Sequence, residues 1–390
     1  MSKDVGKQFI FAALSVGIGL AGFLVVAEVG TRLVVPESRW RFRDAADDWV
    51  RDARAGWVQK PNIDVTTATE HGWEVHFQTN ADGLTPPTAT REKPAGALRV
   101  MLFGDSAVVG RSVPQDQTVH AHLERILRGA GLNVDVVNAG VQGYATDQAL
   151  VRMEQLVPLY KPDIILHGVC DNDFGGNVVS DFAGLGKVRF TLKPDGSLEE
   201  HPPPAGADVA KMGEGPGRWL QLSAFYRVLQ PSLLVLRTSM GTWSGRNLMG
   251  LGDEAYYNPQ ELERRDWALF KRLLTRMKGT ATTNGAQFVM YLHPAISEVW
   301  EPVVQETLHS KGIPPEKYDR YAIEKRVKSA ADETGIGFVP LIDSFRAQQA
   351  RGPFHLLPRD PHCNGRGYEL QAEALAKQIL SKEPARPSSP

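Results

Sequence analysis

The chain has 390 residues, of which 42% are hydrophobic and 23% are charged, the composition of a globular protein with a large core. Its 44 Lys and Arg residues against 45 Asp and Glu residues leave a formal net charge of -1, whereas proteins that bind nucleic acid usually carry a basic excess. Two cysteines in the whole chain exclude zinc ribbons and cysteine-rich scaffolds.

An uncharged, apolar stretch covers residues 8–27 near the N-terminus. Twenty helical residues span about 30 Å, the thickness of a bilayer core. Lys3 and Lys7 precede it, so the positive-inside rule predicts a cytoplasmic tail at 1–7, a single inner-membrane anchor at 8–30 and the rest of the chain on the extracytoplasmic side. The alternative is a cleaved signal peptide followed by a secreted protein, because small residues near the end of the stretch also permit cleavage.

Strands and helices alternate after a turn-rich N-terminal extension at 31–97. The predicted strands are Leu98–Phe103, Val134–Val137, Asp163–Leu166, Phe288–Leu292 and Phe338–Ile342, each of them short and apolar. The predicted helices are Thr118–Arg128, Glu261–Lys278, Ala322–Glu333 and Tyr368–Leu380. This alternation indicates an α/β fold with a parallel sheet, and ligand sites in such folds lie at the carboxyl ends of the strands.

The alternation is interrupted by an insertion at 176–259. A strand at Val188–Leu192 and a turn at 194–196 predict a hairpin. The apolar segment Trp219–Leu236 is either an additional pair of core helices or a lid that forms a wall of an acyl pocket. The last residues, 383–390, are rich in Pro and Ser and are predicted to be disordered.

Two candidate catalytic side chains lie next to predicted elements. Ser106, in a Gly-Asp-Ser turn after the first strand, is placed either to act as a nucleophile or to cap the next helix. His362 lies in a predicted loop before the last helix, with Asp360 two residues earlier, and is the preferred base. His293 and His355 remain possible bases among the ten histidines of the chain.

Two further motifs follow the second and third strands. Gly143 closes the sequence Asn138–Gly143 and is either a turn residue or a backbone N–H donor placed where a side chain would block the substrate. Asn172 lies in Cys170–Asp173, where its amide either donates a hydrogen bond to an oxyanion or forms an Asx turn.

Taken together, these motifs resemble the SGNH family of GDSL-type esterases and lipases over residues 98–382. Ser106, Gly143, Asn172 and His362 match the family's four blocks in order. The resemblance implies a flavodoxin-like three-layer α/β/α sandwich. It also implies a nucleophilic Ser106, a base at His362, and an oxyanion hole formed by Ser106, Gly143 and Asn172. The N-terminal segment before residue 98 resembles that of membrane-anchored bacterial members of this family.

The match departs from the family pattern at three of these motifs. The family usually has Leu after Gly-Asp-Ser, and here Ala107 takes that place. The third block usually begins with Gly, and here Cys170 takes that place. The family's acid usually lies three residues before the histidine, where this chain has Arg359, so the predicted acid is Asp360. Asp343, after the fifth predicted strand, is the next acid to consider.

The predicted function is hydrolysis of an acyl ester on a glycan or a lipid, and an acetyl ester is one candidate. The mechanism is Ser-His-Asp catalysis and uses no cofactor or metal ion. A sugar hydroxyl in place of water would make the same site an O-acetyltransferase of an envelope or extracellular polysaccharide. A third hypothesis, of a different class, is an inactive envelope scaffold.

The two cysteines lie in two of the site motifs. Cys170 is two residues before Asn172, and Cys363 directly follows His362. A disulfide between them would join the oxyanion loop to the base loop in an oxidising compartment. The alternative is a pair of separate buried thiols.

Overall fold

The computed structural model describes residues 3–36, 48–69, 73–182, 185–204, 223–229, 253–357 and 360–382. The chain divides into two compact units. The first comprises Met1–Arg43, Thr66–Glu74 and Gly213–Ser244, and the second comprises Asp44–Val65, Val75–Met212 and Gly245–Pro390.

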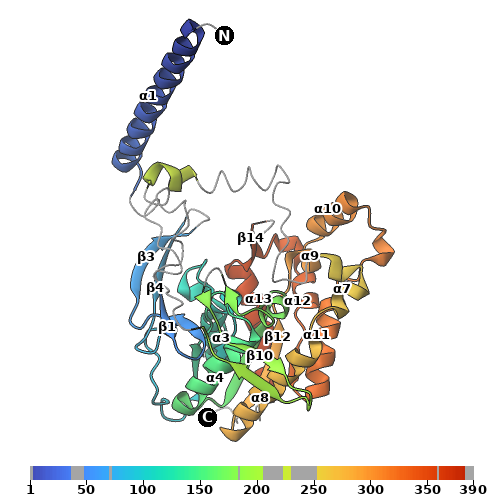
Figure 1. Cartoon of the computed structure of the whole chain (residues 1–390). Coiled ribbons are helices and arrows are strands. Elements are labelled where there is room, and N and C mark those ends of the chain that lie inside the picture. Colours follow the sequence, from blue (N-terminus) through green and yellow to red (C-terminus); the bar gives the residue numbers. More distant parts are fainter. Residues whose placement is uncertain are drawn as a thin grey trace. The chain divides into compact units, whose positions relative to one another are not determined.

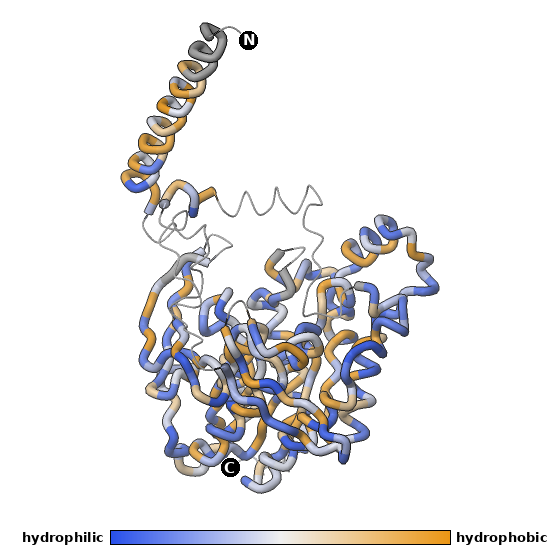
Figure 2. The backbone as a smooth tube through the Cα atoms, in the orientation of Figure 1, coloured by the Kyte–Doolittle hydropathy of each residue, from blue (hydrophilic) through white to orange (hydrophobic). Residues whose placement is uncertain are grey.

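The main element of the first unit is the long helix α1 (Lys3–Val34). Its segment Phe11–Val34 is long and apolar enough to cross a membrane, as an anchor or as a signal sequence. Its apolar side chains are exposed, with Phe11 at 76% and Val16 at 70%, and Figure 2 shows hydrophobic residues along most of the helix.

A short helical segment at 224–229 belongs to the same unit. The Glu28 carboxylate accepts hydrogen bonds from the Ser223 hydroxyl (2.7 Å) and from the Ala224 N–H (3.0 Å) at the start of that segment. Most of the predicted lid segment Trp219–Leu236 lies outside the described residues, and the described part is helical.

A five-stranded parallel sheet forms the centre of the second unit (Figure 1). Its strands are β5 (Leu98–Phe103), β6 (Val134–Asn138), β7 (Ile164–Val169), β12 (Gln287–Leu292) and β13 (Gly337–Val339). The spatial order is β13-β12-β7-β5-β6, and every pair in it is parallel. Numbered along the chain, these strands follow the order 2-1-3-4-5 of flavodoxin-like folds, which confirms the predicted fold class.

Two hydrophobic cores cover the two faces of the sheet, so the architecture is a three-layer sandwich. Met101 and Phe103 of β5 contribute to one core, and Val100 and Leu102 contribute to the other, because successive side chains of a strand point to opposite faces. The first core includes residues of α4 (Thr146–Tyr160), α8 (Trp267–Thr283) and α11 (Ala322–Thr334). The second includes residues of α3 (Val119–Gly129), α12 (Ile342–Arg346) and α13 (Gly365–Leu380).

Smaller elements surround this sandwich. The paired short strands are β1 (Trp49–Asp52) with β2 (Gly56–Gln59), β3 (Asp64–Ala68) with β4 (Glu74–Gln78), β8 (Asp181–Phe182) with β9 (Leu185–Gly186), β10 (Arg189–Leu192) with β11 (Leu198–His201), and β14 (His355–Leu357) with β15 (Asp360–Cys363). The short helices are α2 (Ser106–Val109), α5 (Asp173–Gly176), α7 (Pro259–Glu263), α9 (Ile296–Val299) and α10 (Glu301–Lys311). Single 3-10 turns are η3 (Gln115–Gln117), η6 (Asp253–Tyr256), η7 (Pro315–Lys317) and η8 (Gln349–Arg351).

The predicted hairpin of the insertion is confirmed by β10 and β11, but two predicted boundaries are wrong. The predicted helix Glu261–Lys278 is two helices, because Asp266 accepts a hydrogen bond from the Leu269 N–H and so caps a new helix, α8. The predicted strand Phe338–Ile342 ends at Val339, because the Glu324 carboxylate binds the N–H groups of Leu341 and Ile342, where α12 begins.

Candidate active site

The candidate nucleophile lies in a tight turn after β5. Gly104 has a φ of +154°, and a Cβ there would lie 2.5 Å from the Gly168 carbonyl oxygen, so the turn requires glycine. Asp105 then caps α2 by accepting a hydrogen bond from the Ala107 N–H (2.9 Å). The alternative reading of Ser106 as the helix cap is therefore wrong, and its hydroxyl is available for another partner.

That partner is His362, whose Nε2 lies 2.8 Å from the Ser106 Oγ. The two residues are separated by 256 positions in the sequence, and both are half-buried. Strand β15 carries His362 and pairs with β14 in an antiparallel hairpin. A serine hydroxyl within hydrogen-bond reach of an imidazole is the arrangement of a nucleophile and its general base.

The two other candidate bases lie elsewhere. The His355 Nε2 is 2.9 Å from the Pro294 carbonyl oxygen, and the His293 Nδ1 is 2.7 Å from the Gln371 side-chain amide. Both histidines are buried. Of the three candidates, His362 is thus the one that the structure brings to Ser106.

Asn172 reaches the same turn from the end of β7. Its Nδ2 donates a hydrogen bond to the Asp105 Oδ2 (3.1 Å), and its side chain makes no cap to α5, so the Asx-turn interpretation is wrong. An amide nitrogen has two hydrogens, and one hydrogen bond to Asp105 leaves the second for a substrate oxygen.

Asp105 links the turn at Ser106 to the loop that carries Asn172, a role that the sequence did not reveal. Besides the Ala107 N–H and the Asn172 amide, its carboxylate accepts a bond from the Cys170 Sγ (3.4 Å). Burial, together with the negative charges of Asp105 and Asp173, raises the pKa of Cys170 well above its ordinary value. The residue that replaces the family's glycine therefore stays a neutral thiol that donates to Asp105.

Asp173 organises the loop behind Asn172. Its carboxyl group accepts bonds from the Cys170 N–H (2.8 Å) and from the Thr146 hydroxyl (2.7 Å). Burial and the neighbouring charge of Asp105 raise the pKa of Asp173 well above the usual range. The two carboxyl groups thus share a buried environment that disfavours a second negative charge.

Gly143 lies in the loop between β6 and α4, with a φ of +77°. A Cβ at this position would lie 2.7 Å from the Cε1 atom of Phe182, whose ring stacks on Trp57 at 5.7 Å. At the start of this loop, the Asn138 side-chain amide donates a hydrogen bond to the Val108 carbonyl oxygen of α2 (2.7 Å). Ser106, Gly143, Asn172 and His362 all follow or adjoin the strand ends at which the sequence predicted a site.

The predicted disulfide is wrong, since both cysteines are buried free thiols. Cys170 turns to Asp105, whereas the Cys363 Sγ accepts a hydrogen bond from the Gln371 Nε2 (3.3 Å). The reason is the orientation of the two neighbouring side chains in β15. His362 reaches Ser106, whereas Cys363 joins the core that α13 covers.

The acid of the triad stays a prediction. Asp360 is the first residue of β15, and its side chain lies outside the described residues. The alternative, Asp343, lies on α12, where its carboxylate accepts a hydrogen bond from the Tyr321 hydroxyl (2.7 Å).

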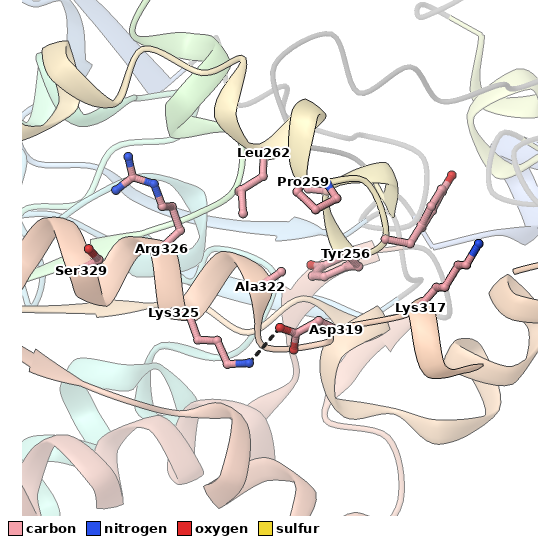
Figure 3. A pocket seen from close by; sticks show the side chains of 11 residues that line it. Tyr256, Pro259, Leu262, Lys317, Asp319, Ala322, Lys325, Arg326 and Ser329 are labelled. Atoms are coloured by element: carbon pink, nitrogen blue, oxygen red, sulfur yellow. Dashed lines mark hydrogen bonds and ion pairs between the residues drawn. The ribbon is translucent and has the colours of Figure 1, made fainter. Parts of the chain in front are cut away.

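An open pocket of about 460 Å³ lies elsewhere, where η6 and α7 meet α11 (Figure 3). Its wall includes Tyr256, Leu262 and Arg326, and an ion pair joins Lys325 to Asp319 at its edge (2.8 Å). None of the predicted site residues lines this pocket, so its position does not support a catalytic role.

No family model matches the chain. An arylesterase of Vibrio mimicus is 27% identical over 103 residues, which are 25% of this chain and 50% of that protein. The match thus spans half the length of the curated relative. It agrees with the sheet order, the order of the motifs and the Ser106–His362 bond. The chain is thus similar to an esterase, and its motifs resemble those of the SGNH (GDSL-type) family.

Several solved structures are similar to the chain at low sequence identity. A lipase/acylhydrolase from Enterococcus faecalis is 12% identical with a TM-score of 0.40, covering 74% of this chain and 99% of that chain. An acetylxylan esterase from Geobacillus stearothermophilus is 14% identical with a TM-score of 0.37, covering 74% of this chain and 96% of that chain.

Proposed function

We propose that this protein is a serine esterase of the SGNH family with Ser106 as nucleophile and His362 as base. The observation that carries the proposal is the 2.8 Å contact between the Ser106 Oγ and the His362 Nε2. His362 takes the hydroxyl proton while Oγ attacks the ester carbonyl. The tetrahedral intermediate then expels the alcohol, which receives the proton from His362. Water, activated by the same imidazole, hydrolyses the acyl-enzyme and restores Ser106.

The proposed oxyanion hole consists of the Ser106 N–H, the Gly143 N–H and the Asn172 side-chain amide. The bond from Asn172 to Asp105 supports this role, because it fixes the amide plane before substrate arrives. A donor that is already oriented needs no reorganisation when negative charge develops on the carbonyl oxygen.

We further propose that Asp360 orients His362. Asp360 and His362 are the first and third residues of β15, and the register between β14 and β15 shifts within this hairpin. With one residue between them, a carboxylate beside the imidazole can accept its Nδ1–H and stabilise the imidazolium.

The substrate we propose is a short acyl ester, with acetyl as the first choice. The support is the ring of Phe182, which lies so close to Gly143 that it would contact an added Cβ. Its stacking on Trp57 holds that ring in place beside the oxyanion loop. A fixed aromatic wall at this position leaves less room for a long acyl chain than an open loop would.

For location, we propose that α1 anchors the protein in the inner membrane with the catalytic unit on the extracytoplasmic side. The support is the apolar segment Phe11–Val34, together with Lys3 and Lys7 before it. An anchored esterase on that side would meet acylated glycans or lipids of the envelope.

The experiment is an acyl-length series of p-nitrophenyl esters, from acetate to octanoate, with the full chain in detergent. The wild-type protein should hydrolyse acetate best, and Ser106→Ala should lose the activity by several orders of magnitude. Ser329→Ala is the matched control, since Ser329 is a half-buried residue that lines the pocket of Figure 3 and lies away from the proposed site. Full activity in a folded Ser106→Ala protein, or an inert wild-type protein, would contradict the proposal, and inertness would favour the scaffold hypothesis.

A further inference from the structure

Three metal-binding residue types gather in a buried cluster that the proposed mechanism does not use. His293, His355 and Cys363 each offer one ligand atom, and these atoms all lie within 4.8 Å of one another. The exposed fractions of the three residues are 6%, 3% and 0%. Imidazole nitrogens and a thiolate are the ligands that borderline and soft transition-metal ions prefer.

The cluster lies behind the hairpin that carries the base. His355 and Cys363 are directly opposed in the register of β14 and β15, so their side chains share one face of the hairpin. His293 directly follows β12, and its backbone N–H bonds to the Val169 carbonyl oxygen. An ion held by all three would therefore tie the His362 hairpin to the central sheet.

A hydrogen bond to its outer nitrogen atom prepares the His355 imidazole for a metal. The His355 Nε2 lies 2.9 Å from the Pro294 carbonyl oxygen, which only accepts, so the proton is on Nε2 and a lone pair is on Nδ1. Ligand histidines in metal sites are usually held by a bond of this kind.

The His293 Nδ1 lies 2.7 Å from the Gln371 side-chain amide. The amide nitrogen of Gln371 faces this Nδ1 and the Cys363 Sγ (3.3 Å), so Nδ1 accepts a hydrogen bond and the proton is on Nε2. Metal binding would require the Gln371 amide to rotate and turn its oxygen to Nδ1, which then donates and leaves a lone pair on Nε2. The Nε2 lies 3.9 Å from the Cys363 Sγ. Metal–sulfur and metal–nitrogen bonds of about 2.3 and about 2.1 Å would place the two ligand atoms roughly 3.6–3.8 Å apart, so a small adjustment suffices.

We propose that His293, His355 and Cys363 bind one transition-metal ion of the soft class, with monovalent copper as the occupant. The thiol of Cys363 releases its proton to solvent on binding, so the thiolate and Cu⁺ together are neutral. Zn²⁺ would leave a net positive charge in a buried site where, among the described residues, no carboxylate joins the cluster. The ion stiffens the hairpin from the side opposite to Ser106.

The test measures metal retention by the full chain in detergent, first stripped with a chelator. One sample receives Cu⁺ under anaerobic conditions with excess ascorbate, and another receives Zn²⁺. After desalting, elemental analysis should find about one copper per chain in the wild-type protein and in Cys170→Ser, the matched control that removes the other buried thiol. Cys363→Ser and His293→Gln should retain none.

A spectroscopic readout keeps the test independent of whether Cys363→Ser folds. In Cys170→Ser, the thiol of Cys363 is the one thiol of the chain, so a thiolate-to-metal charge-transfer absorption on loading assigns the ligand directly. Its unfolding temperature should also rise with loading, because the ion binds the folded state. Equal metal retention in wild-type and Cys363→Ser, or no charge-transfer band in Cys170→Ser, would overturn the site. Retention of zinc but not copper would overturn the choice of ion.

Discussion

Replacement of Asn172 by Ala tests the oxyanion hole most sharply. The Asn172 amide donates one bond to Asp105 (3.1 Å) and has its second hydrogen free for the carbonyl oxygen of the substrate. Removal of one oxyanion donor costs about 3 kcal/mol in the transition state, which corresponds to a fall of about 10²-fold to 10³-fold in kcat. KM should change little, because the bond strengthens only as negative charge develops on the oxygen.

The fold should survive this substitution. Asp105 keeps its bonds from the Ala107 N–H and the Cys170 thiol, so the loss of one bond to a carboxylate should lower the free energy of unfolding by about 1.5–3 kcal/mol. The matched control is Asn133→Ala, which removes an exposed amide that donates to the Ala95 carbonyl oxygen (3.2 Å). Steady-state kinetics with p-nitrophenyl acetate measure kcat and KM for both variants and the wild-type protein. A folded Asn172→Ala enzyme with kcat within threefold of wild type would refute the assignment of this donor.

Three further predictions follow from the same structure. Asp360→Asn should lower kcat less than His362→Ala, because the Asp360 substitution weakens the orientation of the base, whereas the His362 substitution removes the base. In the same kinetic assay, an equal or larger loss of kcat in Asp360→Asn would contradict this order. Burial lowers the pKa of both His120 and His167 to about 4. As the pH falls below about 6.5, these two histidines bind protons in the unfolded chain before they do so in the folded protein. The free energy of unfolding should therefore decline between pH 6.5 and 4, by up to roughly 3 kcal/mol for each group. Urea titrations at several pH values measure this decline, and a slope that His120→Gln leaves unchanged would exclude that residue as a source. Protease added to spheroplasts should digest the catalytic unit of an anchored protein, whereas protection of that unit would reverse the proposed orientation.

The strand elements could be predicted because their signals are local. The apolar run of β5 ends at Gly104, and its predicted and observed bounds are identical, Leu98–Phe103. The pairing of Ser106 with His362 was expected from the resemblance to the SGNH motifs. It does not follow from the strand ends alone, because His362 lies in the hairpin strand β15 and not at the end of a strand of the central sheet.

Other elements are stabilised by residues far away in the chain, so no local sequence pattern predicts them. Helix α4 was not predicted because it buries polar side chains and contains Pro158, so no clean apolar stripe marks it. Gln148 of this helix bonds to the Ala55 carbonyl oxygen, and Arg152 bonds to the Asp82 carbonyl oxygen, both far away in the N-terminal extension. Such bonds satisfy buried polar groups that a sequence pattern alone would place at the surface.

The disulfide prediction failed for a related reason. The sequence placed His362 in a loop, where two consecutive side chains have no fixed relation. In the structure, residues 360–363 form a strand in which His362 contacts Ser106, whereas Cys363 joins the core. The orientation that separates the two thiols brings Cys363 to His293 and His355.

The central claim is that Ser106 is a nucleophile activated by His362, and covalent labelling tests it most directly. The full chain in detergent is incubated with a fluorophosphonate, and the intact mass and the modified peptide are determined by mass spectrometry. We predict a single adduct on Ser106 in the wild-type protein, much slower labelling in His362→Ala and none in Ser106→Ala. An unlabelled Ser106 in the folded wild-type protein, or an adduct on another residue, would contradict the account.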